Sequence, residues 1–270
     1  MSETRPSTAR IGDVTLAYTD RGRGPTLLLL HGHAYDRSMW ARQVEVFAGL
    51  GWRVVAPDLR GFGQSGITEG IVYTEEFADD VASLLDHLGT SPAVVVGFSM
   101  SGQIAMELVG RHPERVRGLV LVATVHEAED RAGRRRRHAT ADAILTGGME
   151  TYGRSVLGRM LAEATVESSP GVAAEVLAML RNAPAKGAAA AMRGRAERRD
   201  LGDVLRGVRI PVLVVVGADD VFDGGSGRRM ADLAPGAELV VVDGAGHTPN
   251  LEQPAAFDDA LRAFLRRFTG

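Results

Sequence analysis

The stretch VVVGFSMSGQIAMEL, residues 94–108, joins a run of β-forming residues to a helix-forming segment through a turn with Ser99 at its apex. A strand, a sharp turn and a helix in this order present a serine at the end of a sheet, where it can act as a nucleophile. The residues two positions either side of the apex must be small, because they press against the strand and the helix. Gly97 meets this requirement. Ser101 stands where the pattern G-x-S-x-G has its second glycine, and it is also small; we assign no role to its hydroxyl group.

Apolar runs of strand length recur along the chain, and each is bounded by turn residues. Continuous Val and Leu runs are typical of strands buried on both faces, and amphipathic helical stretches such as residues 73–88 lie between them. An alternating segment at residues 9–24 predicts an antiparallel hairpin at one edge. We therefore expect an α/β fold with a mostly parallel, eight-stranded sheet flanked by helices. The six apolar runs are TLLLL (26–30), WRVVAP (52–57), AVVVGF (93–98), GLVLVAT (118–124), VLVVVG (212–217) and ELVVVD (238–243).

The alternation of strands and helices stops in the middle of the chain. Residues 126–205 contain no strand-like run and are rich in Ala, Arg and Met with helical periodicity. We expect an inserted helical cap here, between a first part of the core at residues 1–125 and a second part at 206–270. The basic cluster RAGRRRRH, Arg131–His138, is interpreted as a solvated helix face, with recognition of an acidic group or partner as the alternative.

Composition excludes several classes of function. The 270-residue chain contains no cysteine, which excludes disulfides, cysteine-ligated metals and thiol nucleophiles. A net charge of −3 gives no reason to expect nucleic acid as a partner. No apolar run approaches the ~18 residues of a membrane span, and the first ten residues are polar, so we expect a cytoplasmic protein without membrane association. We expect a small-molecule acyl substrate and no cofactor or metal, and we leave a homo-oligomer open.

A nucleophilic serine needs a histidine base and a carboxylate that orients the base. Asp219 and Asp220 follow the apolar run at 212–217, and His247 follows the run at 238–243. In an open α/β sheet the carboxyl ends of the strands carry the site, and the chain order serine, acid, histidine is typical of one hydrolase architecture. One of the two aspartates is expected to orient the base, and the other to cap a helix or face solvent.

An oxyanion hole requires backbone N–H groups that point at the developing negative charge. Met100, directly after the nucleophile, supplies one N–H by position, and the loop HGHAYD after the first apolar run supplies the second. Gly32 permits the turn, and the N–H of His33 is the expected donor. The side chains of His31 and His33 are expected to brace the loop and to line the pocket; a metal site is the alternative, but no third ligand lies at zinc-like spacing.

At this point the chain resembles the α/β-hydrolase superfamily, in the group of small cofactor-free esterases, lactonases, carbon–carbon bond hydrolases and non-haem haloperoxidases. The resemblance implies the fold above, places the acid on Asp220 rather than Asp219, and tolerates serine at position 101. It also implies that Asp58, Arg60 and Gly63 brace the site without entering the chemistry. Five stretches carry it: HGHAYDRSMW (31–40), APDLRGFGQS (56–65), VVVGFSMSGQIAMEL (94–108), PVLVVVGADD (211–220) and GAGHTPNLEQPAAF (244–257).

The sequence thus predicts a serine hydrolase that cleaves an ester or lactone through an acyl-enzyme. Ser99 is the expected nucleophile, His247 the base and Asp220 its orienting acid, with the N–H groups of Met100 and His33 as the oxyanion hole. The alternatives are a carbon–carbon bond hydrolase or a perhydrolase with the same triad, and a ligand-binding or isomerising protein.

The pocket is expected between the sheet and the cap, with a mostly apolar wall contributed by the cap. Such a wall suits a mid-sized, mostly apolar acyl compound. The residues expected to line the pocket are Tyr35, Trp40, His126, Met149 and Met160.

Overall fold

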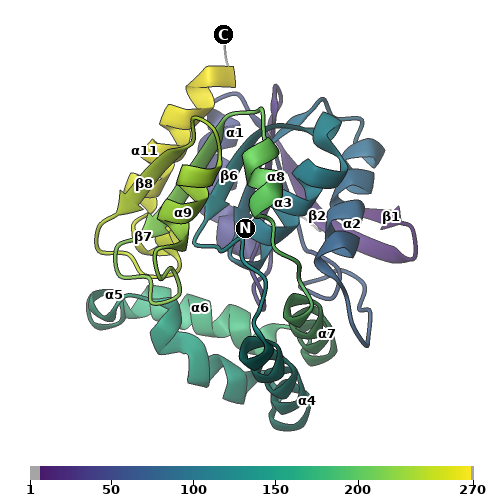
Figure 1. Cartoon of the computed structure of the whole chain (residues 1–270), viewed down its shortest axis with the longest axis vertical. Coiled ribbons are helices and arrows are strands. Elements are labelled where there is room, and N and C mark those ends of the chain that lie inside the picture. Colours follow the sequence, from purple (N-terminus) through teal and green to yellow (C-terminus); the bar gives the residue numbers. More distant parts are fainter. Residues whose placement is uncertain (1–6, 269–270) are drawn as a thin grey trace, which may run out of the picture.

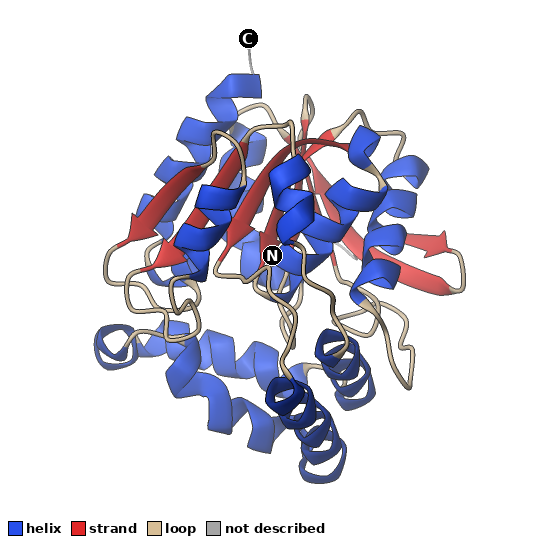
Figure 2. Ribbon diagram, viewed as in Figure 1, coloured by secondary structure: helices blue, strands red, loops and turns tan. Residues whose placement is uncertain are grey.

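The computed structural model describes residues 7–268, and an eight-stranded sheet forms its centre (Figure 2). Strands β1 (Ser7–Ile11) and β2 (Val14–Arg21) form the antiparallel hairpin expected at one edge, and β2 also pairs antiparallel with β4 (Arg53–Pro57). All other pairings are parallel, and the strand order is β1-β2-β4-β3-β5-β6-β7-β8. The predicted fold class is therefore confirmed. The remaining strands are β3 (Thr26–Leu30), β5 (Ala93–Phe98), β6 (Val116–Val122), β7 (Val212–Gly217) and β8 (Glu238–Val242).

Helices cover both faces of the sheet (Figure 1). One face carries α2 (Thr74–His87), α3 (Met100–Arg111), α8 (Gly202–Gly207) and α9 (Ser226–Leu233), which pack side by side in that order. The other face carries α1 (Ala41–Gly49) and α11 (Pro254–Leu265), which are joined because the Gln43 amide donates to Asp258 at 2.9 Å. A short helix α10 (Pro249–Glu252) precedes α11. None of the helices within residues 7–268 is both long enough and apolar enough to cross a membrane.

A separate layer of helices lies at the carboxyl ends of the parallel strands (Figure 1). It consists of α4 (Arg131–Met160), α5 (Glu163–Ser168), α6 (Pro170–Asn182) and α7 (Ala185–Ala196). Helix α4 is interrupted at Gly148, where φ is 78° and ψ is 167°. Only glycine adopts this conformation without strain, so the break falls at this residue. The two halves of α4 can therefore pack on α6 and α7 in different directions.

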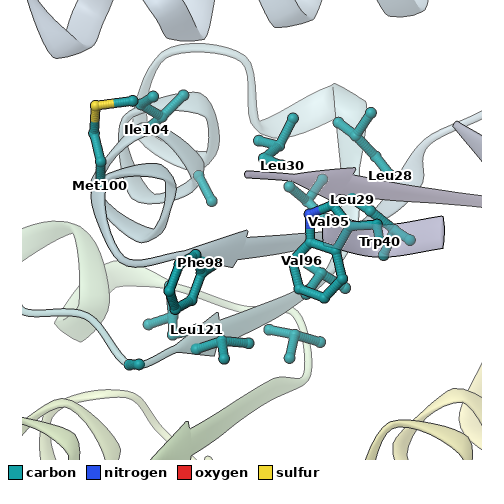
Figure 3. Packing of buried hydrophobic residues seen from close by; sticks show 14 of the residues in the cluster. Leu28, Leu29, Leu30, Trp40, Val95, Val96, Phe98, Met100, Ile104 and Leu121 are labelled. Atoms are coloured by element: carbon teal, nitrogen blue, oxygen red, sulfur yellow. The ribbon is translucent and has the colours of Figure 1, made fainter. Parts of the chain in front are cut away.

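The core lies between the sheet and its flanking helices (Figure 3). Leu28, Leu29 and Leu30 of β3 and Val95 and Val96 of β5 are fully buried, as expected for strands covered on both faces. Each such side chain contributes about 1.5–3 kcal/mol through its burial. Strands β3 and β5 are thereby held in register, with Leu30 beside Gly97, so the loops that follow them meet at one point.

Candidate active site

Ser99 occupies the turn between β5 and α3, with φ 52° and ψ −111°. A positive φ in a residue other than glycine costs energy, and such strain concentrates at functional sites. Two glycines make the turn sterically feasible. A Cβ at Gly97 would lie 2.2 Å from the carbonyl oxygen of Ser101, and a Cβ at Gly102 would lie 2.3 Å from the methyl group of Thr124. The helix can therefore begin directly after Ser99.

Ser101, the departure from the glycine pattern, has a structural partner. Its hydroxyl is fully buried and donates a hydrogen bond to the carbonyl oxygen of His31. This bond ties the first turn of α3 to the loop after β3. The sequence carried no signal for the contact, because 70 residues separate the two partners.

Ser99, His247 and Asp220 form a continuous hydrogen-bonded chain. The Ser99 Oγ lies 2.9 Å from His247 Nε2, and His247 Nδ1 lies 2.9 Å from Asp220 Oδ2. Because a carboxylate only accepts, Nδ1 carries the ring proton and Nε2 is free to accept from the serine. The other carboxylate oxygen, Asp220 Oδ1, accepts from the N–H of Phe222 at 2.9 Å. Asp219 is exposed, so the structure brings Asp220 and not Asp219 to the histidine.

Aromatic rings enclose the His247 imidazole. The ring of Phe222 stands edge-on at 4.8 Å between centroids, and the ring of Phe98 is tilted at 5.2 Å. Phe222 in turn carries the guanidinium of Arg159 over its face at 4.3 Å. Phe222 was not predicted from the sequence, although its position two residues after Asp220 places it in the same loop.

The loop after β3 lies close against the serine turn. A Cβ at Gly32 would lie 2.7 Å from the Phe98 ring and 3.4 Å from the Ser99 Cβ, so the close approach requires glycine. Within residues 7–268, neither the N–H of His33 nor that of Met100 has a hydrogen-bond partner. The two N–H groups expected to form an oxyanion hole are thus both available beside Ser99.

The rings of His31 and His33 are both neutral, and they bind different parts of the structure. His31 Nε2 accepts from the N–H of Leu59 at 2.9 Å, while Nδ1 donates to the Gly32 carbonyl at 2.8 Å. Burial lowers the pKa of His31. His33 Nε2 donates to the Ala188 carbonyl of α7 at 2.9 Å, and burial, followed by the charge of Arg195, lowers the pKa of His33 to about 3. His31 therefore braces the loop, and His33 ties it to the helical layer.

The loop after β4 supports the same region. The Asp58 carboxylate accepts from the backbone N–H groups of Arg37 and Gln64, each at 2.8 Å. Gly63 has a φ of 52°, and a Cβ there would lie 2.2 Å from that carboxylate. Arg60 makes a two-pronged ion pair with Asp80, both bonds 2.7 Å long. These contacts lie outside the serine–histidine–aspartate chain and hold the surrounding loops.

A cavity of about 440 Å³ opens beside Ser99 and His247, between the strand-end loops and helices α4, α6 and α7. This volume suits a small-molecule ligand. The expected apolar wall is present only in part, at residues such as Val156, Leu180 and Met192. The expectation of a mostly apolar wall was wrong about charge. Among the described residues, five arginines and only two carboxylates line the cavity. These are Arg136, Arg137, Arg159, Arg195 and Arg198, with Glu129 and Asp223.

Two of the five residues expected to line the pocket, Tyr35 and Met160, do line it. The other three are corrected. Trp40 ends a 3₁₀ turn that directs it into the core (Figure 3). It is fully buried there, and its ring lies 6.0 Å from the Phe257 ring between centroids. Met149 follows the break at Gly148 and is buried among the helices.

His126 also lies apart from the cavity. Its carbonyl accepts from the N–H of Leu201 at 3.0 Å, and its ring lies 3.4 Å from the Glu127 carboxylate. It joins the entry and exit of the helical layer, which explains why its place after a strand did not bring it to the pocket. Tyr152 is one of the lining residues that were not predicted from the sequence. Its hydroxyl lies 3.4 Å from His33 Nδ1.

Known proteins resemble this chain over nearly its whole length. The profile of the alpha/beta hydrolase fold family matches residues 25–254. The chain is 29% identical to 3-oxoadipate enol-lactonase 2 of Acinetobacter baylyi, over 95% of each protein. Among solved structures, a thermophilic esterase from Thermogutta terrifontis with malate bound shares 34% identity and a TM-score of 0.92 over 99% of each chain. The enol-lactonase from Burkholderia xenovorans LB400 shares 28% identity and a TM-score of 0.89, over 96% of this chain and 100% of that one.

Proposed function

Since the chain belongs to the α/β-hydrolase family, we propose that it is a serine hydrolase that cleaves a carboxylic ester or a lactone through an acyl-enzyme on Ser99. The observation that carries the proposal is the hydrogen-bonded chain from Ser99 through His247 to Asp220 at the wall of a cavity. The names of the similar proteins, an esterase and two enol-lactonases, support an ester or lactone bond as the target.

Acylation begins with attack of the Ser99 hydroxyl oxygen on the carbonyl carbon of the substrate. His247 Nε2 takes the hydroxyl proton, and Asp220 stabilises the resulting imidazolium through Nδ1. The negative charge that develops on the substrate oxygen is held by the N–H groups of Met100 and His33, and loss of one such donor typically costs about 3 kcal/mol of barrier. His247 then gives its proton to the departing alkoxide, which leaves the acyl group on Ser99.

Deacylation repeats these steps with water as the nucleophile. His247 accepts a proton from the water as it attacks the acyl carbon, and returns that proton to Ser99 Oγ when the ester bond breaks. In a lactone, the alkoxide released in the first step stays attached to the acyl group, so the final product is a single hydroxy acid.

The helical insertion at residues 126–205 acts, in this proposal, as a cap on a core made of residues 1–125 and 206–270. Supporting contacts join the core to the insertion, for example the hydrogen bond from the His33 ring to the Ala188 carbonyl. The cap would hold the acyl group of the substrate against the strand-end loops and exclude water from the chemistry.

A fluorophosphonate probe tests the proposal directly, because it reacts only with an activated serine. Mass spectrometry of the folded protein should locate one adduct on Ser99, and the Ser99→Ala protein should remain unlabelled. Ser155→Ala, an exposed position on α4, is the matched control and should label fully. Absence of an adduct on Ser99 would refute the proposed function. A panel of p-nitrophenyl esters of increasing acyl length, run beside simple lactones, then distinguishes the two substrate types.

A further inference from the structure

Three arginines from different segments meet on one wall of the cavity. Arg137 comes from α4, Arg195 from α7 and Arg198 from the segment after α7, and we call them the arginine cluster. All three line the same cavity as Ser99 and His247. The charge of Arg195 also acts on the His33 side chain, which lines the cavity together with Ser99. The cluster and the proposed nucleophile therefore share one cavity.

Glu129 is the only carboxylate in contact with the cluster among residues 7–268. Its Oε1 accepts from Arg137 Nε at 2.5 Å and lies 2.8 Å from Arg198 Nη1. Although burial opposes it, the charges of Arg137 and Arg198 lower the pKa of Glu129. One negative charge is thus shared by two guanidinium groups, and the cluster keeps an excess of positive charge.

Arg195 has no partner at all within the described residues. No carboxylate oxygen there lies within 4.0 Å of its nitrogens, and its Nε is buried without a hydrogen bond. Burial, together with Arg137 and Arg198, lowers the pKa of Arg195 well below its usual value. Arg198 differs, because its Nη1 lies 2.8 Å from Glu129 Oε1 and its Nε donates to the Glu127 carbonyl at 2.8 Å.

Arg195 is half-buried, and a guanidinium whose Nε is buried without an acceptor is costly to the folded protein, since that N–H loses its hydration and gains no hydrogen bond. A purely structural arginine would be expected to find a carboxylate or carbonyl acceptor. The guanidinium fork suits a planar, two-oxygen anion, to which it can donate two parallel hydrogen bonds. The missing partner is therefore best supplied by a ligand that enters the cavity.

We propose that the arginine cluster binds a carboxylate group of the substrate, with Arg195 as its principal partner, so that the enzyme acts on esters or lactones that carry a second, ionised carboxyl group. The inference rests on the proposed function for the nature of the bond that is cleaved. Exposed Arg136 and Arg159, which also line the cavity, add positive potential that draws such an anion inward.

Binding to the Ser99→Ala protein tests the proposal without turnover. Isothermal titration calorimetry compares the monomethyl esters of succinic, glutaric and adipic acids, which are monoanions at pH 7.5, with their neutral dimethyl esters. At least one monoanion should bind about 10- to 100-fold more tightly than its dimethyl ester, the range expected for hydrogen bonds to a charged group. Adding Arg195→Met should reduce that preference to less than threefold.

Arg193→Met is the matched control, because Arg193 lies on the same helix and pairs with the exposed Asp142 at 2.7 Å. It should keep the full charge preference. Thermal unfolding monitors folding: without ligand, Arg195→Met should have a Tm no lower than its parent, since the change removes a buried N–H that has no acceptor. The anion that shows the preference should raise the Tm of the parent and leave that of Arg195→Met unchanged.

Several results would overturn the carboxylate site. These are equal binding of monoanions and diesters, no binding of either, or a charge preference that survives Arg195→Met. The outcome is separable from that of the proposed function. A Ser99 adduct without a charge preference removes only the carboxylate site, whereas a charge preference lost with Arg195 and no adduct on Ser99 keeps the anion site and removes the hydrolase.

Discussion

Replacing Asp220 by asparagine should place the wrong tautomer of His247 against Ser99. The Asp220 Oδ1 accepts from the N–H of Phe222, so the asparagine side-chain oxygen is held in the same place and its amide NH₂ faces His247 Nδ1. Because the amide can only donate there, Nδ1 becomes an acceptor and the ring proton moves to Nε2. Nε2 then cannot take the proton of Ser99, although every heavy atom keeps its position.

The expected loss in kcat is about 10⁴-fold, the effect of the same substitution in the serine-protease triad, which corresponds to about 5.4 kcal/mol. Initial rates on p-nitrophenyl acetate measure it, with thermal unfolding to show that the variant is folded. Asp219→Asn is the control, since Asp219 is exposed and is held only through its N–H to the Ala245 carbonyl at 2.9 Å; it should stay within about twofold of the parent. A loss from Asp219→Asn equal to or larger than that from Asp220→Asn would refute the assignment.

Three further predictions concern the loops around the site. Ser101→Ala should fold and still label at Ser99, but should lose about 1–3 kcal/mol in urea unfolding, because the buried carbonyl of His31 loses its donor; an unchanged stability would contradict this. His33 stays neutral down to about pH 3, whereas the unfolded chain protonates it near pH 6.5, so acidification from 6.5 to 5 should cost about 1.6 kcal/mol through this residue. The free energy of unfolding of His33→Asn should fall less over this pH range. An equal fall in the two proteins would contradict the prediction. Gly97→Ala should destabilise the fold by about 3 kcal/mol or more, because its Cβ meets backbone, whereas Gly158→Ala in open space on α4 should gain about 0.5–1 kcal/mol.

The sheet could be predicted from the sequence because its central strands, such as β3, β5 and β7, are buried on both faces and therefore read as unbroken apolar runs. The remaining errors lie at strand ends, where a single dihedral angle decides the boundary. The run 118–124 was expected to be one strand, but β6 ends at Val122 because Ala123 adopts a φ of 48° and turns the chain. Nothing in the residue type at position 123 signals this turn.

The residues of the proposed triad could be found from the sequence for a similar reason. Each follows a recognisable strand, and parallel strands bring their carboxyl ends to the same edge of the sheet. The choice between Asp219 and Asp220 depended on resemblance to a family, and the structure supplies its physical basis in the 2.9 Å contact with His247. Trp40 shows the limit of the reasoning, because its place in a strand-end loop was known but the direction of its side chain was not.

The lining of the cavity could not be predicted, because helical periodicity does not tell which polar residues of a helix face a partner. Within the basic cluster at 131–138, Arg134 pairs with the surface residue Glu197 while Arg137 turns to the buried Glu129. Arg134 therefore fits the interpretation of a solvated helix face, whereas Arg137 lines the cavity, and recognition of an acidic group by it stays a proposal. Only the packing of α4 against α7 decides which arginine faces the cavity. It places Arg137 and Arg195 in the cavity wall and leaves Arg134 in solvent.

This arrangement divides the two tasks of the proposed enzyme between different parts of the fold. Ser99, Asp220 and His247 stand on loops whose positions follow from the register of β5, β7 and β8, so displacing one of them disturbs the sheet. Arg137 and Arg195 stand on helices that pack mainly on one another, so their side chains can change without moving a strand. Selection among acyl compounds should therefore be altered by substitutions in α4 and α7 that leave labelling of Ser99 intact. The unpaired Arg195 is the first of these positions to test, because it alone among the cluster gives up no hydrogen bond or ion pair within residues 7–268 when it is replaced.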